Sequence, residues 1–189
     1  MTGLDINRVL RRLKPEKHGP SLQRRSDAEL LFVESEAVAG APLLLDSCVY
    51  IHVLRGKTPQ HVDELLRART IYHSAVAISE LTNRLGSHVP QNERESDAQN
   101  ELRETIADIP QHRMIIPSVA TWAEAGVLAG MRARLGGYNK GQEQDGLNDA
   151  ILLLQARSTG VVLLTANVLD FDLLQQLVPD ARVLFYRAT

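Results

Sequence analysis

The sequence is poor in the features that stabilise small secreted domains or hold a chain in a membrane. Cys48 is the only cysteine among 189 residues, which excludes both a disulfide within the chain and a multi-cysteine zinc site. No apolar run approaches the ~20 residues that span a bilayer, and the basic N-terminus lacks the apolar stretch of a signal peptide. We therefore expect a cytoplasmic protein in a reducing compartment, with no membrane partner.

Several motifs that would point to a particular chemistry are also missing. The phosphate-binding patterns G-x-x-x-x-G-K-[ST] and G-x-G-x-x-G do not occur. The six histidines show no ligand spacing, and aromatic residues make up only 4% of the chain. We expect Trp122 to lie in the core, so stacking of single-stranded bases is not evident. We expect Cys48 to be a small buried side chain, because nothing nearby marks it as a nucleophile.

Charge is divided unevenly along the chain. Residues 1–25 carry seven basic and two acidic side chains, a net charge of +5, which leaves −7 for residues 26–189 in a protein of net charge −2. A basic segment on an acidic body suggests an anionic partner. A solvated, partly disordered leader is the alternative.

The basic segment belongs to an N-terminal extension that we place at residues 1–42. Helices are expected over residues 4–13 and 26–37, the second opening with the capping-box pattern Ser26-Asp27-Ala28-Glu29. The run Ala39-Gly40-Ala41-Pro42 is typical of a linker. We expect the extension to be dispensable for folding of residues 43–189. Its role is open between recruitment of an anionic partner such as a nucleic acid and packing on the body or on a second subunit.

From residue 43 onward, short apolar runs alternate with longer helical stretches. Strands are expected at residues 43–45, 71–74, 114–116, 161–164 and 183–186, and helices at 48–54, 60–69, 77–86, 97–109, 118–135, 146–159 and 168–177. Residues 87–96 are expected to be a loop, and Gly136, Gly137 and Gly141 a flexible connection. This pattern predicts an α/β fold with a mostly parallel sheet and helices on both faces.

Acidic side chains stand at or after the ends of several of these strands, where ligands bind in such sheets. They are Asp46, Glu80, Asp149 and a choice between Asp170 and Asp172. Converging carboxylates need cations to offset their repulsion, and an all-oxygen set favours Mg²⁺ or Mn²⁺. Such a centre activates water and stabilises charge on a phosphodiester. The alternatives are structural, with Asp46 or Asp170 serving as a helix cap and Glu80 as an exposed helix acid.

We prefer Asp170 to Asp172 as the fourth acid. Asp170 follows Asn167 by three residues, so the two side chains share a helical face. Asp172 lies two residues further along the helix, so its side chain is rotated by about 200° around the helix axis from that of Asp170.

Four motifs in this order resemble the PIN-domain ribonucleases, in particular VapC-like toxins of type II toxin–antitoxin systems. They are Leu44-Leu45-Asp46-Ser47, Ile78-Ser79-Glu80-Leu81, Leu147-Asn148-Asp149-Ala150-Ile151 and Leu164-Thr165-Ala166-Asn167-Val168-Leu169-Asp170-Phe171. The resemblance covers about residues 43–186. It departs from the family pattern at Cys48, where Asn or Ser is frequent, and in the presence of residues 1–42.

The resemblance implies a PIN-like fold and a Mg²⁺- or Mn²⁺-dependent endoribonuclease. Members of this family are usually homodimers, and an antitoxin protein holds them inactive. It assigns catalysis and metal binding to Asp46, Glu80, Asp149 and Asp170, and supporting roles to Ser47, Thr165 and Asn167. Hydrolysis by water would leave a 5′-phosphate and a 3′-hydroxyl. On the expected long helix, Arg132 and Arg134 are candidates to bind RNA phosphates. The alternative function is a non-catalytic module of the same fold that binds RNA or a protein.

Overall fold

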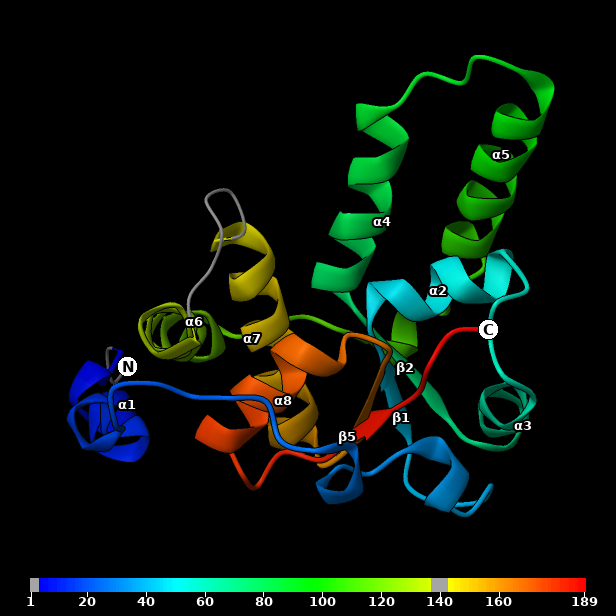
Figure 1. Cartoon of the computed structure of the whole chain (residues 1–189). Helices are drawn as coiled ribbons and strands as arrows, with labels where there is room; N and C mark the ends of the chain where they lie inside the picture. Colours follow the sequence, from blue (N-terminus) through cyan, green and yellow to red (C-terminus); the bar gives the residue numbers. More distant parts are fainter. Residues whose placement is uncertain (1–3, 137–142) are drawn as a thin grey trace.

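A single parallel sheet lies at the centre of the protein (Figure 1). Residues 4–136 and 143–189 are described by a computed structural model, and within them the sheet has five strands in the order β3-β2-β1-β4-β5. The strands are β1 Leu43–Leu45, β2 Ile71–Ser74, β3 Met114–Ile115, β4 Val162–Thr165 and β5 Val183–Phe185. Every neighbouring pair is parallel, so all strands point their carboxyl ends to one edge, as the apolar runs predicted.

Alternation along the strands divides the core into two layers. Leu44 packs on one face with helices α6 Val119–Gly136, α7 Glu143–Thr159 and α8 Val168–Leu177. Leu43 and Leu45 pack on the other face with α2 Ser47–Leu54 and α3 Gln60–Ala68. Successive strand residues point to opposite faces, so apolar residues at every position produce a sheet covered on both sides.

Two helices, α4 Ala75–Ser87 and α5 Glu93–Ala107, form a hairpin that rises from the body (Figure 1). The stretch 87–96, expected to be a loop, is shorter than predicted because α5 already begins at Glu93. The side chain of Asn92 accepts a hydrogen bond from the Glu95 N–H and caps this earlier start. The hairpin places α4, which follows β2, beside the carboxyl edge of the sheet.

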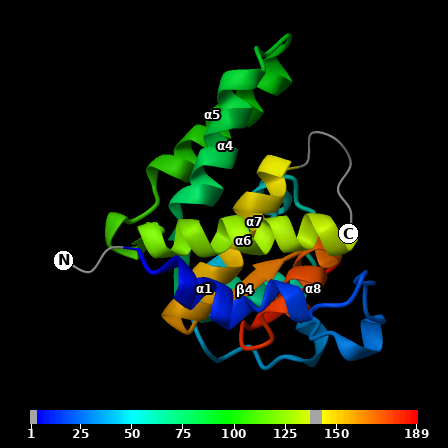
Figure 2. The ribbon, with the colours of Figure 1, turned by 90° about the vertical axis from the view of Figure 1, so that its left-hand side faces the viewer.

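The first helix, α1 Ile6–Leu13, lies alongside α6 (Figure 2). Val9 and Leu13 are buried in the same apolar cluster as α6. The amphipathic pattern predicted this helix, and packing of its apolar face was one of the two roles that the sequence left open.

The helix predicted over residues 26–37 is wrong. The capping box between Ser26 and Glu29 forms, but it closes only a 3₁₀ turn, Asp27–Glu29, and a second such turn covers Val33–Ser35. Between the turns the chain is extended, and Phe32 forms a parallel bridge with Phe185 of the edge strand β5. The N–H of Phe185 donates to the carbonyl of Leu31 at 2.9 Å. Pairing with an open sheet edge therefore overrides the local helical preference.

A buried arginine holds the segment that was expected to be a linker. Arg69 donates hydrogen bonds to the carbonyl oxygens of Ala37, Val38 and Ala41 and forms an ion pair with Glu36 at 2.9 Å. A Cβ at Gly40 would lie 2.8 Å from the guanidinium carbon, so this close approach requires glycine. The division at residue 42 remains a prediction, and residues on both sides of it share the same core.

The start of α6 also differs from expectation. Trp122, expected in the core, is 44% exposed, and its neighbours Ile116 and Val119 are 77% and 74% exposed. These residues precede the part of α6 that packs on the sheet, which begins at Glu124 and Ala125. Gly137 and Gly141 lie outside the described residues. In the part of the chain that is described, no helix is both long and apolar enough to cross a bilayer.

Candidate active site

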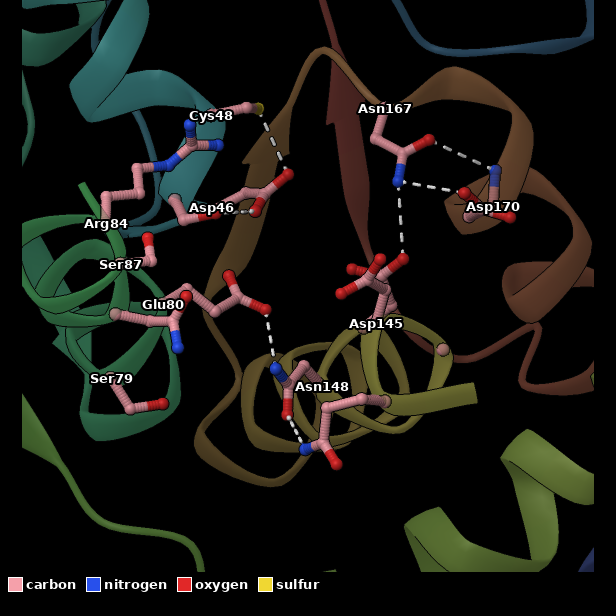
Figure 3. A pocket seen from close by; sticks show the side chains of 15 residues that line it. Asp46, Cys48, Ser79, Glu80, Arg84, Ser87, Asp145, Asn148, Asn167 and Asp170 are labelled. Atoms are coloured by element: carbon pink, nitrogen blue, oxygen red, sulfur yellow. Dashed lines mark hydrogen bonds between the residues drawn. The ribbon is translucent and has the colours of Figure 1, made fainter. Parts of the chain in front are cut away.

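The acidic side chains that follow the strands line one cavity of about 820 Å³ (Figure 3). Asp46 follows β1, Glu80 lies on α4, Asp149 lies on α7, and Asp170 lies on α8 after β4. The parallel topology brings these four segments to the carboxyl edge of the sheet, as expected. The cavity is polar and open to solvent, with the acids on its inner wall.

Asp46 is held by hydroxyl and thiol donors. Its Oδ2 accepts hydrogen bonds from Thr165 Oγ1 at 2.6 Å and from Cys48 Sγ at 3.1 Å. Ser47 Oγ lies 3.4 Å from Oδ1. Although Asp46 directly precedes α2, its side chain makes no capping hydrogen bond to that helix. A helix cap is therefore not the reason for an aspartate here.

Asn167 joins two of the acids. Its Nδ2 donates to Asp149 Oδ2 at 3.3 Å and to Asp170 Oδ2 at 3.1 Å, and Figure 3 shows its side chain directed toward the acids. The same side chain caps α8 by accepting from the Asp170 N–H. Asn167, rather than Asp170, is thus the cap of this helix, which leaves the Asp170 carboxylate facing the cavity.

Glu80 is half-buried and faces the cavity from α4. Its Oε1 accepts a hydrogen bond from Asn148 Nδ2 at 2.7 Å (Figure 3). Burial raises the pKa of Glu80, and the negative charges of Asp46 and Asp145 raise it further, against the lowering effect of hydrogen bonds from Ser47 and Asn148. An exposed, solvated glutamate would show none of these contacts.

Asp172 lies away from the cavity and has a structural partner. It is fully buried, and it accepts hydrogen bonds from Arg25 Nε at 2.6 Å and from the Arg25 N–H at 2.7 Å. Asp172 thus ties the N-terminal extension to α8. The preference for Asp170 agrees with this placement, since Asp170 alone of the two lines the cavity.

Of the two arginines expected to bind RNA phosphates, Arg132 is buried, contrary to expectation, and Arg134 is exposed. Arg132 is only 3% exposed and forms an ion pair with Asp170 at 2.7 Å, so it does not present a surface guanidinium to a phosphate. Arg134 is exposed and donates to the carbonyl oxygen of Pro15 at 2.7 Å. Its RNA-binding role stays a prediction, whereas Arg132 belongs to the acid site.

Sequence reasoning missed several residues of the cavity, and Cys48 and Arg84 are two of them. Cys48 was expected to be a plain apolar side chain, but its thiol contacts Asp46 and accepts from the Ala166 N–H at 3.4 Å. Arg84 is exposed on α4 and lines the cavity mouth (Figure 3). The spacing of four residues between Glu80 and Arg84, which puts both on one helix face, is the signal that could have found it.

The electrostatics of the cavity favour a bound cation. The pKa of Asp149 is raised well above its ordinary value, first by burial and then by the negative charges of Asp46, Asp170 and Glu80. Among the residues described, no three His, Cys, Asp or Glu side chains come close enough to form a ready metal cage. Mg²⁺ commonly keeps several waters and binds through one or two carboxylates, so an open set of oxygen donors fits it.

This electrostatic strain predicts how the stability of the metal-free protein depends on pH. The folded state holds a proton on Asp149 at pH values where the unfolded state, with a pKa near 3.8, has lost it. The free energy of unfolding therefore falls as pH rises from about 3.8 through the raised pKa, and Glu80 adds a contribution of the same sign. In the presence of a chelator, Asp149→Asn should flatten this decline and raise the melting temperature at neutral pH. Identical melting curves for both proteins from pH 5 to pH 8 would refute the assignment.

The comparisons with known proteins agree with this geometry. The family described as PIN domain matches residues 43–172, more than half of the chain. Among solved structures, VapBC2 from Rickettsia felis bound to a DNA fragment from their promoter is similar with a TM-score of 0.51 and 16% identity, covering 77% of this chain and 98% of that one. FitAcB from Neisseria gonorrhoeae is similar with a TM-score of 0.53 and 21% identity, covering 76% and 96%. No curated protein matches the chain significantly in sequence.

Proposed function

Because the chain belongs to the PIN domain family, we propose that it is a Mg²⁺- or Mn²⁺-dependent endoribonuclease, whose active site is the acidic cavity. The observation that carries the proposal is the position of Asp149. Its buried carboxylate is held beside the negative charges of Asp46 and Asp170, and it accepts a hydrogen bond from the neutral amide of Asn167. A fold that needs only stability would avoid such a cluster.

Asp46, Glu80 and Asp149 are the residues proposed to hold the cation, with Asp170 at the side of the site. A bound divalent cation supplies positive charge that offsets the carboxylates and the scissile phosphate, and it activates water. Thr165 and Ser47 orient Asp46, and Asn167 orients Asp149 and Asp170, so each carboxylate keeps its position before RNA arrives.

Arg84 is proposed to bind a phosphate of the RNA next to the scissile bond. Among the cavity-lining residues that the structure describes, Arg84 is the positively charged one. It is exposed, so an RNA strand that enters the cavity could reach it. Guanidinium groups bind phosphates through paired N–H donors. This side chain takes the role that sequence reasoning gave to Arg132.

We also propose that the protein is the toxin of a toxin–antitoxin pair. The support is the resemblance of its motifs to VapC-like toxins, together with the shared fold of VapBC2 and FitAcB. The homodimer and the cytoplasmic location implied by that resemblance stay predictions.

Cleavage assays with purified protein test the proposed reaction. Incubated with single-stranded RNA and Mn²⁺ or Mg²⁺, the protein should produce fragments with a 5′-phosphate and a 3′-hydroxyl. Chelation should stop the reaction, and added Mn²⁺ should restore it. RNA that is bound but never cut, with either metal, would instead favour the non-catalytic module.

Metal titrations of two variants test which aspartate belongs to the site. Asp170→Asn should weaken Mn²⁺ binding about 10- to 100-fold, because it removes a carboxylate beside the ion. Asp172→Asn should leave Mn²⁺ affinity within about twofold of wild type and should lower the melting temperature, since it weakens the contact with Arg25. A larger loss of Mn²⁺ affinity in the Asp172 variant would reverse the assignment.

A further inference from the structure

A buried arginine lies behind the acidic cavity, in direct contact with the fourth carboxylate. Arg132 Nη2 is 2.7 Å from Asp170 Oδ1, and Arg132 is 3% exposed. The other carboxylate oxygen, Asp170 Oδ2, accepts from Asn167 Nδ2 at 3.1 Å. Both oxygens of Asp170 are therefore engaged by donors of the chain itself, and one of these donors is a guanidinium.

The chain keeps space open for this guanidinium. Gly136 lies one helical turn after Arg132 on α6, and a Cβ built there would be 2.6 Å from Arg132 Nη1 and 3.2 Å from its Cζ. The absence of a side chain at Gly136 thus leaves room for the guanidinium of Arg132, which reaches Asp170 from there.

We propose that Arg132 takes the place of a second metal ion, so that the active site binds a single divalent cation on the side of Asp46 and Asp149. The inference rests on the proposed function, because it concerns the number of ions in that same site. Two features carry it: the direct ion pair with Asp170 and the burial of the guanidinium.

Simple electrostatics explains the effect. A divalent ion bound to Asp170 would lie close to a fixed positive charge, in a region where burial weakens screening by solvent. It would also have to displace the charge-assisted hydrogen bond from Arg132. The donors that contact Asp46 and Asp149 are instead neutral groups, Thr165 and Cys48 on Asp46 and Asn167 on Asp149, which do not repel a cation. Arg132 is a positioning residue in this account, since it acts through Asp170.

Titration of the purified full-length protein with Mn²⁺, with free Mn²⁺ followed by electron paramagnetic resonance, tests the inference. Wild type should bind one ion per chain. Arg132→Met should bind two, because Asp170 is released to serve as a ligand. Arg132→Lys, which keeps the charge, should return the ratio to one.

A second variant reaches the same contact without removing the charge. Gly136→Ala should displace the guanidinium and introduce a second Mn²⁺ site weaker than that of Arg132→Met, and it adds only one methyl group at the last residue of α6. Two ions of similar affinity in wild type, or one ion in both Arg132→Met and Gly136→Ala, would overturn the inference. Binding of two ions by Arg132→Lys would show that the positive charge at position 132 does not exclude the second ion. No Mn²⁺ binding by wild type would overturn the proposed function itself, and this inference with it.

Discussion

Asparagine in place of Asp46 or Asp149 should lower the rate of RNA cleavage at least ~100-fold, because removing a metal ligand removes most of the charge stabilisation it provides. The two variants approach the site from different elements, Asp46 after β1 and Asp149 on α7. Asparagine keeps the shape of the side chain and much of its hydrogen bonding. The loss should therefore come from the missing negative charge and not from collapse of the cavity.

Stability measurements separate this effect from misfolding. Asp149→Asn should melt at a higher temperature than wild type in a chelator, since it removes one of several buried carboxylates that repel one another. Asp108→Asn, at an exposed position after α5, serves as the matched control and should cleave at the wild-type rate. If both active-site variants fold and cleave like wild type, the cavity is not the catalytic site.

Deletion of residues 1–42 should leave a product that is insoluble or that unfolds far below the melting temperature of the full chain. Sequence reasoning expected this segment to be dispensable, and the packing leads to the opposite expectation. Val9, Leu13 and Val33 are at most 6% exposed, and each is worth about 1.5–3 kcal/mol when buried. Their combined loss is comparable with the whole stability of a typical domain, about 5–15 kcal/mol. A soluble product with an unchanged melting temperature would contradict this account.

A single substitution isolates one of the contacts that the deletion removes. Arg25→Met leaves the fully buried Asp172 without its cationic partner and should cost about 3–5 kcal/mol of unfolding free energy. Replacing both residues, as Arg25→Met with Asp172→Leu, should recover most of that loss. Arg11→Met is the control, because its ion pair with Asp5 spans 3.7 Å on an exposed surface and is worth ~0–1 kcal/mol. Equal melting temperatures for Arg25→Met and wild type would show that the segment is not anchored here.

The same packing indicates which role the basic residues of segment 1–25 have. Arg12 is paired with Glu124, Arg24 with Asp27, and Arg25 with Asp172. Charges that are neutralised within the chain have less to offer an RNA. Of the two roles left open by the sequence, the structure therefore favours packing on the body.

The carboxylates proposed for catalysis could be located from the sequence because they follow from local patterns. Apolar runs predict strands, and parallel strands share one carboxyl edge. Asp46 directly follows β1, and Asn167 lies two residues after the end of β4. The remaining contacts join residues far apart in the chain. Arg132 meets Asp170 across 38 positions and Arg25 meets Asp172 across 147, and no periodicity encodes such pairs. The extended path of Leu31 and Phe32 likewise depends on β5, which comes more than 150 residues later.

The measurement that tests the central claim most directly is anomalous diffraction from crystals of the protein soaked in Mn²⁺. The account predicts a strong anomalous peak within the acidic cavity, within ligand distance of the carboxylate oxygens of Asp46 or Asp149, and no peak there in crystals of Asp149→Asn. A peak elsewhere with an empty cavity, in a preparation that cleaves RNA in a Mn²⁺-dependent reaction, would contradict it.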